Sequence, residues 1–135
     1  CRDNGRYGIS IGHKDTDNLF VRNVVQGNAR DGVYFRDETE PMAGHRNVLR
    51  DNVIEDNGGP EHGCGIHVDG ETHDLTFEGN TIRDTRPEGR KTQRIGLYIG
   101  PKAGRIQSSD NIIEGNGTAA VQDDSSGRKG KEGEG

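Results

Sequence analysis

The sequence lacks several of the residues that build an ordinary globular core. It contains no tryptophan and one methionine, and hydrophobic residues make up only 27% of the chain. Four leucines are too few for a leucine-rich repeat. Cys1 and Cys64 are the only cysteines, which excludes a disulfide framework or a cysteine-rich metal cluster, so free thiols are expected.

An excess of positive charge and long apolar segments are also missing. The formal net charge of −5 argues against a nucleic-acid partner and against an anionic membrane surface. No apolar run reaches the roughly 20 residues that a membrane-spanning helix needs. Low hydrophobicity is also typical of disordered chains, but here the net charge is modest and the apolar residues recur at regular positions. A repeating fold needs fewer apolar residues, because each repeat buries its face against the next.

Glycine, in contrast, is abundant, with 22 residues, and four glycines begin the same short pattern. Each is followed by an aliphatic residue, a variable residue and another apolar residue, an alternation typical of a half-buried strand. The copies lie at residues 8–11, 32–35, 65–68 and 96–99. If they stack, the variable residues form one outward column of Ser10, Tyr34, His67 and Tyr98.

A second pattern, built around asparagine, lies between the glycine strands. Its copies begin at Asn23, Asn52, Asn80 and Asn111, and so regular a spacing predicts a solenoid. A second asparagine follows five residues later, except in the third copy, where Thr85 replaces it. Asparagine tolerates left-handed backbone angles at a bend, and stacked amides can bond along the axis. We therefore expect an asparagine ladder.

Each repeat is predicted to hold three short strands, with the glycine strand first, a second strand before the ladder asparagine and a third after it. The second strand places an apolar residue three positions before the asparagine, as at Phe77. In the fourth repeat Ser108 stands at that position, and Ile106 is a candidate to replace it in the core.

With these Gly-Ile-x-Val/Ile strands and Asn-x-Ile-x-x-Asn turns, residues 1–123 resemble the right-handed parallel β-helix family, the pectate-lyase-like superfamily. The resemblance implies an all-β, right-handed parallel β-helix solenoid of about four coils, each with three short strands. It also implies an extracellular or periplasmic location. Residues 124–135 are polar and glycine-rich, and we expect them to form a flexible tail.

The N-terminal residues match the third strand of a repeat. Aligning Asn4 with Asn28 gives Cys1 the inward position of Val25. We therefore expect the chain to be a fragment, with the rest of a parent chain stacking on its N-terminal coil.

Loops of uneven length flank the glycine strands on both sides, and variable loops on a rigid scaffold often carry function. In enzymes of the family that the chain resembles, a polysaccharide lies along this face. Aromatic rings suit sugars, and an arginine pairs with a uronate carboxylate or a sulfate. The predicted catalytic residues are His67, Asp69 and Arg36, and the predicted substrate-binding residues are Tyr34, Tyr98, Ser10 and His13.

The leading hypothesis is recognition or modification of an acidic polysaccharide, in the manner of a lyase or an epimerase. In this scheme His67 or a tyrosine moves a proton at a sugar carbon and Arg36 stabilises the developing carboxylate charge. The alternative is a non-catalytic β-helix segment of a surface, adhesin or tailspike-like protein. In that case His67 is a surface residue, and Arg36 and Asp69 form an ion pair between neighbouring coils.

No cofactor is expected from the sequence, and two metal sites remain as alternatives. One is calcium bound by acidic loop residues, drawn from Asp15, Asp17, Asp37, Glu38 and Glu71. The other is a histidine site in the same groove, drawn from His13, His62, His67 and His73 with Asp15 or Asp69. The catalytic aspartate clusters of the family's polygalacturonases have no convincing counterpart in this sequence.

Overall fold

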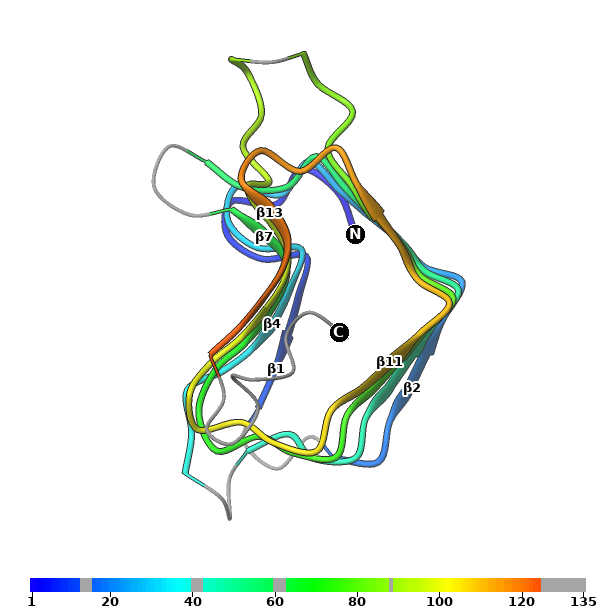
Figure 1. The fold of residues 1–135 in the computed structure, drawn as a ribbon, viewed down its shortest axis with the longest axis vertical. Coiled ribbons are helices and arrows are strands. Elements are labelled where there is room, and N and C mark those ends of the chain that lie inside the picture. The colour runs from blue at the N-terminus through cyan, green and yellow to red at the C-terminus, as the bar shows by residue number, and fades with distance from the viewer. Residues whose placement is uncertain (13–15, 40–42, 60–62, 88, 125–135) are drawn as a thin grey trace.

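The computed structural model describes residues 1–12, 16–39, 43–59, 63–87 and 89–124. Over these residues the chain forms thirteen short strands, and no helix is present (Figure 1). Within the same part of the chain, no helix is long and apolar enough to cross a membrane. The predicted all-β architecture is confirmed.

The strands form three parallel sheets, and each strand pairs with its counterpart in the next coil. The first sheet contains β1 (Ile9–Ile11), β4 (Val33–Phe35), β7 (Cys64–Val68), β10 (Ile95–Ile99) and β13 (Ala119–Asp123). The second contains β2 (Leu19–Val21), β5 (Val48–Arg50), β8 (Thr76–Glu78) and β11 (Gln107–Ser109). The third contains β3 (Val24–Gln26), β6 (Val53–Glu55), β9 (Thr81–Arg83) and β12 (Ile112–Glu114).

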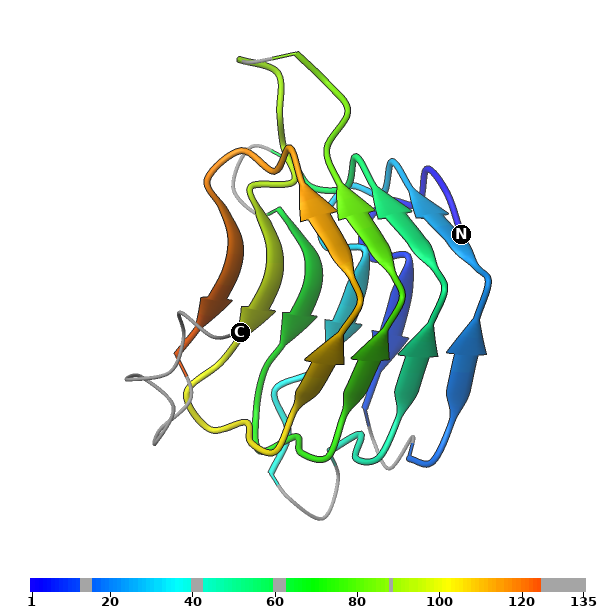
Figure 2. The ribbon, with the colours of Figure 1, turned by 45° about the vertical axis from the view of Figure 1, so that its right-hand side comes forward.

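Consecutive strands belong to different sheets, so the chain winds through all three before it returns to the first. Figure 2 shows the resulting stack, in which the strands of one sheet lie side by side along the solenoid axis. Strands β1 to β12 make four successive sets of three, and β13 begins the next. This is the predicted parallel solenoid of about four coils.

The core is a narrow column of apolar side chains between the three sheets. Alternate residues of most strands point into it, and the largest fully buried side chains include Phe35, Leu49, Ile54, Ile66 and Phe77. In-register stacking places the apolar side chains of neighbouring coils against one another. Phe77, for example, pairs with Leu49 in the coil before it. Burial of this kind contributes about 25 cal/mol for each Å² of apolar surface removed from water.

The fourth coil keeps this register in spite of its polar residue. Ser108 pairs with Phe77 and is exposed. Ile106 is 8% exposed and joins the core two residues earlier in the chain. Ile106 therefore adds to the core without taking the position of Ser108.

The four pattern glycines are required by packing. A Cβ atom on Gly65 would lie 2.5 Å from Cγ2 of Ile82 and 2.8 Å from the carbonyl oxygen of Gly96. Gly32 has the same relation to Ile54, on the third strand of its own coil, at 2.8 Å. The first strand of each coil thus approaches the third strand so closely that only glycine fits at this point.

The predicted asparagine ladder is present. The backbone N–H and the side-chain amide of Asn23 both donate to Oδ1 of Asn52, at 2.8 and 3.1 Å. Asn52 makes the same pair of bonds to Asn80, and Asn80 makes it to Asn111. The ladder satisfies buried polar groups that would otherwise lack partners at this corner of each coil.

The left-handed backbone angle predicted for asparagine belongs instead to the residue before it. Arg22 and Asp51 have φ angles of 54° and 56°, and the next residue in each case is a ladder asparagine. All ten asparagines of the chain follow a residue with positive φ, and none has a positive φ itself. The preceding residue makes the bend, and the asparagine supplies the amide that bonds to the next coil.

A second ladder runs along another corner and contains one glutamine. Asn28 donates twice to Asn57, and Asn57 donates twice to Oε1 of Gln93. Gln93 Nε2 then donates to Oδ1 of Asn116, at 2.9 Å. Thr85, which replaces the expected asparagine in the sequence, lies outside this ladder and bonds to Asp56.

The segment between Thr85 and Gln93 leaves the coil as an outward loop (Figure 2). Asp84 holds the two ends of this loop together. The buried Asp84 carboxylate accepts hydrogen bonds from the backbone N–H groups of Arg86, Thr92 and Gln93. The Arg86 guanidinium binds the same carboxylate.

The first residues of the chain lie beside β3. Arg2 pairs with Gln26, and Asn4 donates to Asn28, so residues 1–4 run along β3 as the alignment of Asn4 predicts. Of the predicted tail, residues 125–135 lie outside the described part of the chain.

Candidate functional site

The predicted outward column exists on the first sheet. Ser10 pairs with Tyr34, Tyr34 with His67, and His67 with Tyr98, so one side chain from each coil points outward in step. The backbone of this sheet bows toward the interior of the solenoid, so that its outer face is concave in outline (Figure 1). The column therefore lies on the outer face of the first sheet and runs along the solenoid axis.

Four rings on this outer face touch one another in sequence. Tyr7 stacks on Tyr34 with centroids 4.6 Å apart, and Tyr34 lies 5.0 Å from the ring of His67. Tyr98 meets His67 edge to face, also at 5.0 Å. We call Tyr7, Tyr34, His67 and Tyr98 the ring row. The strand pattern predicts three of its members but not Tyr7, which precedes the first glycine strand.

His67 is also held from the two sides of the row by carboxylates. Its Nδ1 atom lies 3.0 Å from Oδ2 of Asp31, and its Nε2 atom lies 3.2 Å from Oδ1 of Asp69. The Tyr34 hydroxyl donates to the other oxygen of Asp69, at 3.0 Å. Asp31 is in turn oriented by the backbone N–H of Cys64, which donates to its Oδ1 atom at 3.0 Å. The imidazole is thus fixed in one orientation.

The protonation states follow from these contacts. Burial opposes the charged form of His67, but the Asp31 and Asp69 carboxylates outweigh it and raise the pKa of the imidazole above its ordinary value. Burial and the hydrogen bond to Asp69 raise the pKa of Tyr34 well above its usual range, so its hydroxyl remains a proton donor. Burial, with the nearby Asp124 carboxylate, also raises the pKa of Tyr98.

Arg36 lies beside the row but does not form the predicted pair with Asp69. Its Nη1 atom donates to the Ser10 hydroxyl at 3.0 Å, and its Nε atom lies 3.5 Å from Glu38. Asp69 is engaged by His67 and Tyr34 instead. The expected ion pair between coils is therefore wrong, because a glutamate two residues away on the same loop is the nearer partner of Arg36.

Two further arginines flank the row near the N-terminus. The guanidinium groups of Arg6 and Arg30 lie 5.6 and 5.8 Å from the centroid of the Tyr7 ring. With Arg36, they place three cationic groups beside the first two coils of the row. Arg6 and Arg30 are not predicted from the sequence, because each lies two residues before a pattern glycine and so outside the four-residue pattern.

The predicted residue His13 lies outside the described residues, as does His62. His73 does not approach His67. It stacks on His45 with centroids 3.8 Å apart, and its Nδ1 atom lies 2.6 Å from the carboxylate of Asp74. The described part of the alternative histidine site is therefore not assembled.

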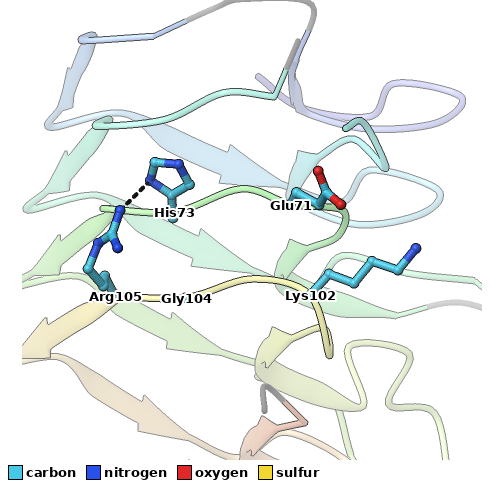
Figure 3. Close-up of a pocket in the computed structure, with 5 residues that line it drawn as sticks. All are labelled: Glu71, His73, Lys102, Gly104 and Arg105. Atoms are coloured by element: carbon cyan, nitrogen blue, oxygen red, sulfur yellow. Dashed lines mark hydrogen bonds between the residues drawn. The ribbon is translucent and has the colours of Figure 1, made fainter. Parts of the chain in front are cut away.

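A separate pocket of about 430 Å³ lies among the turns that follow β7 and β10. Figure 3 shows its lining residues, with the Arg105 guanidinium directed at the His73 ring. Arg105 also forms two hydrogen bonds with the Asp74 carboxylate, and these bonds hold the pKa of Asp74 well below its usual range. Because Arg105 and Asp74 already neutralise each other, the pocket offers less for a charged ligand than the ring row does. Its lining residues are Glu71, His73, Lys102, Gly104 and Arg105.

Asp31 is the contact of His67 that sequence reasoning missed. It directly precedes Gly32 and so fell outside the four-residue pattern used to align the strands. Counting back from the pairing of Val33 with Ile66 places Asp31 beside Cys64. Both residues stand one position before the glycine that begins each copy of the pattern.

Comparison with known proteins bears on the fold. No curated protein and no solved structure matches the chain significantly. A family model described as the right handed beta helix region matches residues 1–130, which include all of the described strands. That match covers nearly the whole sequence and agrees with the three parallel sheets, the buried ladders and the predicted handedness. The chain belongs to the right-handed β-helix family.

Proposed function

We propose that this protein binds an acidic polysaccharide along the ring row and modifies it in a lyase- or epimerase-like reaction. The observation that carries the proposal is the unbroken row of Tyr7, Tyr34, His67 and Tyr98, with centroids 4.6 to 5.0 Å apart. A linear polymer laid along the solenoid axis meets one of these rings in each coil, at a spacing of about 4.8 Å.

Ring contact supports a sugar ligand in particular. Tyrosine combines an apolar ring face, which packs on sugar C–H groups, with a hydroxyl that bonds to sugar hydroxyls. Tyr34, His67 and Tyr98 are each partly exposed, so each has surface to offer.

The charges beside the row support an acidic ligand. Arg6, Arg30 and Arg36 stand along one end of it, and a guanidinium binds a carboxylate or sulfate through two parallel hydrogen bonds. The pairing of Arg36 with Ser10 and Glu38 holds the guanidinium beside the row.

The modification step uses groups in the same row. His67, Tyr34 and Tyr98 occupy successive coils, so a sugar ring above His67 has proton-exchanging groups beneath it and on both sides. Arg36 would stabilise the carboxylate charge that develops when a proton leaves the neighbouring carbon. Asp69 orients His67. An extracellular or periplasmic location is part of the proposal.

Binding is tested with two matched arginine variants on a panel of acidic and neutral glycans. The side chains of Arg36 and Arg50 are 39% and 46% exposed, and each pairs with a glutamate, at 3.5 and 3.0 Å, but Arg50 belongs to the second sheet. Arg36→Ala should weaken binding of the acidic glycan roughly 10-fold or more, the value of a charged hydrogen bond. Arg50→Ala should leave it unchanged. Equal effects of the two variants, or equal binding of neutral glycans, would remove the support for this face.

The reaction is tested by incubating each bound glycan with the protein and following the absorbance of unsaturated uronate, with NMR to detect epimerised sugars. Loss of turnover in His67→Ala and in Tyr34→Phe, with binding retained, supports the enzyme. Binding without any turnover favours the non-catalytic alternative, a β-helix segment of a surface, adhesin or tailspike-like protein.

A further inference from the structure

The side of His67 that faces away from Asp69 contains an unusual group of side chains. Asp31, Cys64 and His67 each offer one potential ligand atom, and these three atoms lie within 4.8 Å of one another. We propose that Asp31, Cys64 and His67 bind a divalent cation of the zinc class. This site goes beyond the proposed polysaccharide function, and its test needs no sugar.

The donor set points to the cation. A thiolate, an imidazole nitrogen and a carboxylate oxygen together match zinc and its close relatives, whereas calcium and magnesium take oxygen ligands. The ligand atoms of a tetrahedral zinc centre lie roughly 3.3 to 3.7 Å apart, given bonds of about 2.0 to 2.3 Å. His67 Nδ1 and Asp31 Oδ2 are already 3.0 Å apart. Small side-chain adjustments are enough to admit the ion.

The groups behind the ligands are also arranged as metal sites require. A histidine that binds a metal through one nitrogen usually donates the other to a carboxylate, which fixes its orientation. His67 does this with Nε2, 3.2 Å from Asp69, and Asp69 is itself held by the Tyr34 hydroxyl. On the other side, Asp31 Oδ1 accepts the backbone N–H of Cys64, which leaves Oδ2 for the ion. Two of the three ligands are thus oriented before any metal binds.

The backbone brings the ligands together through the coil repeat. Cys64 begins β7, Asp31 lies just before β4, and these two strands are hydrogen-bonded neighbours. The Cys64 residue is 8% exposed and the Asp31 side chain 4%, while the His67 side chain is 18% exposed. A cation here would be shielded from bulk water. With three protein ligands, it keeps a position for water or another ligand.

Metal binding changes what His67 can do. The ion takes the place of the proton between His67 and Asp31, and both this proton and the Cys64 thiol proton pass to solvent. His67 then acts as a ligand, and proton exchange with a bound sugar is left to Tyr34 and Tyr98.

The experiment uses cobalt(II) and zinc on the full chain. Cobalt(II) should give one equivalent of binding, with visible bands of a tetrahedral centre and the charge-transfer band of a cobalt–thiolate bond, and zinc should displace it. Cys64→Ser should abolish the charge-transfer band, and Asp31→Asn should weaken binding at least 10-fold. Cys1→Ser is the matched control, because Cys1 is the exposed cysteine and lies outside the cluster.

Circular dichroism of each variant without metal separates loss of binding from loss of fold. If Cys64→Ser does not fold, cadmium NMR of the wild-type chain reports sulfur coordination directly. A wild-type chain that folds but shows no thiolate band and no sulfur-bound cadmium would overturn the proposal. Binding that survives Cys64→Ser, or depends on Cys1, would do the same. Polysaccharide binding that persists after zinc is removed would leave the proposed function standing, so the two can fail separately.

Discussion

Asn57 and Gln93 are neighbours in one amide ladder, although 36 residues separate them in the sequence. Both the backbone N–H and the side-chain amide of Asn57 donate to Gln93 Oε1, at 3.1 and 2.9 Å. Gln93 is completely buried. In the third coil the ladder position is therefore occupied by Gln93, which follows a loop.

Replacing Gln93 with alanine should destabilise the protein by roughly 3 kcal/mol, because two buried donors of Asn57 lose their acceptor. Gln93→Leu keeps most of the volume, so a similar loss in that variant would assign the effect to the hydrogen bonds. The midpoint of urea unfolding gives the measurement. Gln107→Ala, at an exposed position of β11, should change stability by less than about 0.5 kcal/mol. Equal effects at Gln93 and Gln107 would contradict the assignment.

Asp84 should make stability depend on pH. Burial opposes its ionised form, but the Arg86 side chain and the backbone N–H groups of the loop outweigh burial and hold the pKa of Asp84 below its usual value. Its folded pKa is depressed, so the stability it contributes is present above the unfolded value of about 3.9 and is lost as the pH falls below it. Asp84→Asn should cost about 2 kcal/mol near neutral pH.

The difference between wild type and Asp84→Asn should shrink as the pH falls below the unfolded value of about 3.9. Unfolding of both proteins in urea at a series of pH values measures it. Glu114→Gln, at an exposed position of β12, serves as the control and should show little difference at any pH. A difference for Asp84→Asn that stays constant with pH would show that the carboxylate charge is not involved.

The pattern glycines should be intolerant of even one added methyl group. Gly65→Ala would place its Cβ against Ile82 and the Gly96 carbonyl, so a loss of about 2 to 3 kcal/mol is expected. At Gly5 and Gly104 nothing lies within 4 Å of an added Cβ. Alanine at these two positions should be neutral or stabilise the chain by about 0.5 kcal/mol. Thermal unfolding of the three variants compares them directly, and a tolerated Gly65→Ala would refute the packing argument.

The two thiols should react at very different rates with a thiol reagent. Cys1 is exposed, and Cys64 is buried at the start of β7. We expect one rapidly titrated thiol in the native protein and a second only after urea is added. Cys1→Ser should remove the rapid phase alone. Two rapid thiols in the native wild-type protein would show that β7 is open to solvent at its beginning.

Much of the fold follows from the sequence because each coil repeats the same short-range pattern. Alternation at Ile66 and Val68 identifies a strand, and the copies at Val33 and Leu97 fix its register with the neighbouring coils. The column of outward residues is then a matter of counting. The local pattern predicts the long-range pairing because each strand residue pairs with the residue at the same position of the repeat in the next coil.

The parts that could not be predicted depend on residues outside the repeat. Gln93 follows a loop, so counting from Asn80 leads to Thr85 and misses the residue that returns to the ladder. Asp31 reaches His67 from the bend before a strand, where a period of two no longer gives the direction of a side chain. Arg36 pairs with Glu38 on its own loop and not with Asp69, the residue at the counterpart position in the next coil.

The glutamine that closes the second ladder also shows how this chain can change length. The loop between Thr85 and Gln93 leaves the coil and returns, yet the strands on both sides remain paired in register, β9 with β6 and β10 with β7. An inserted loop requires only a buried amide, such as that of Gln93, where the chain returns to the ladder, and the core residues need not change. Such a corner can therefore accept inserted sequence of new composition. In evolution or in the laboratory, a new surface can be added beside the first sheet while the stacked coils stay as they are.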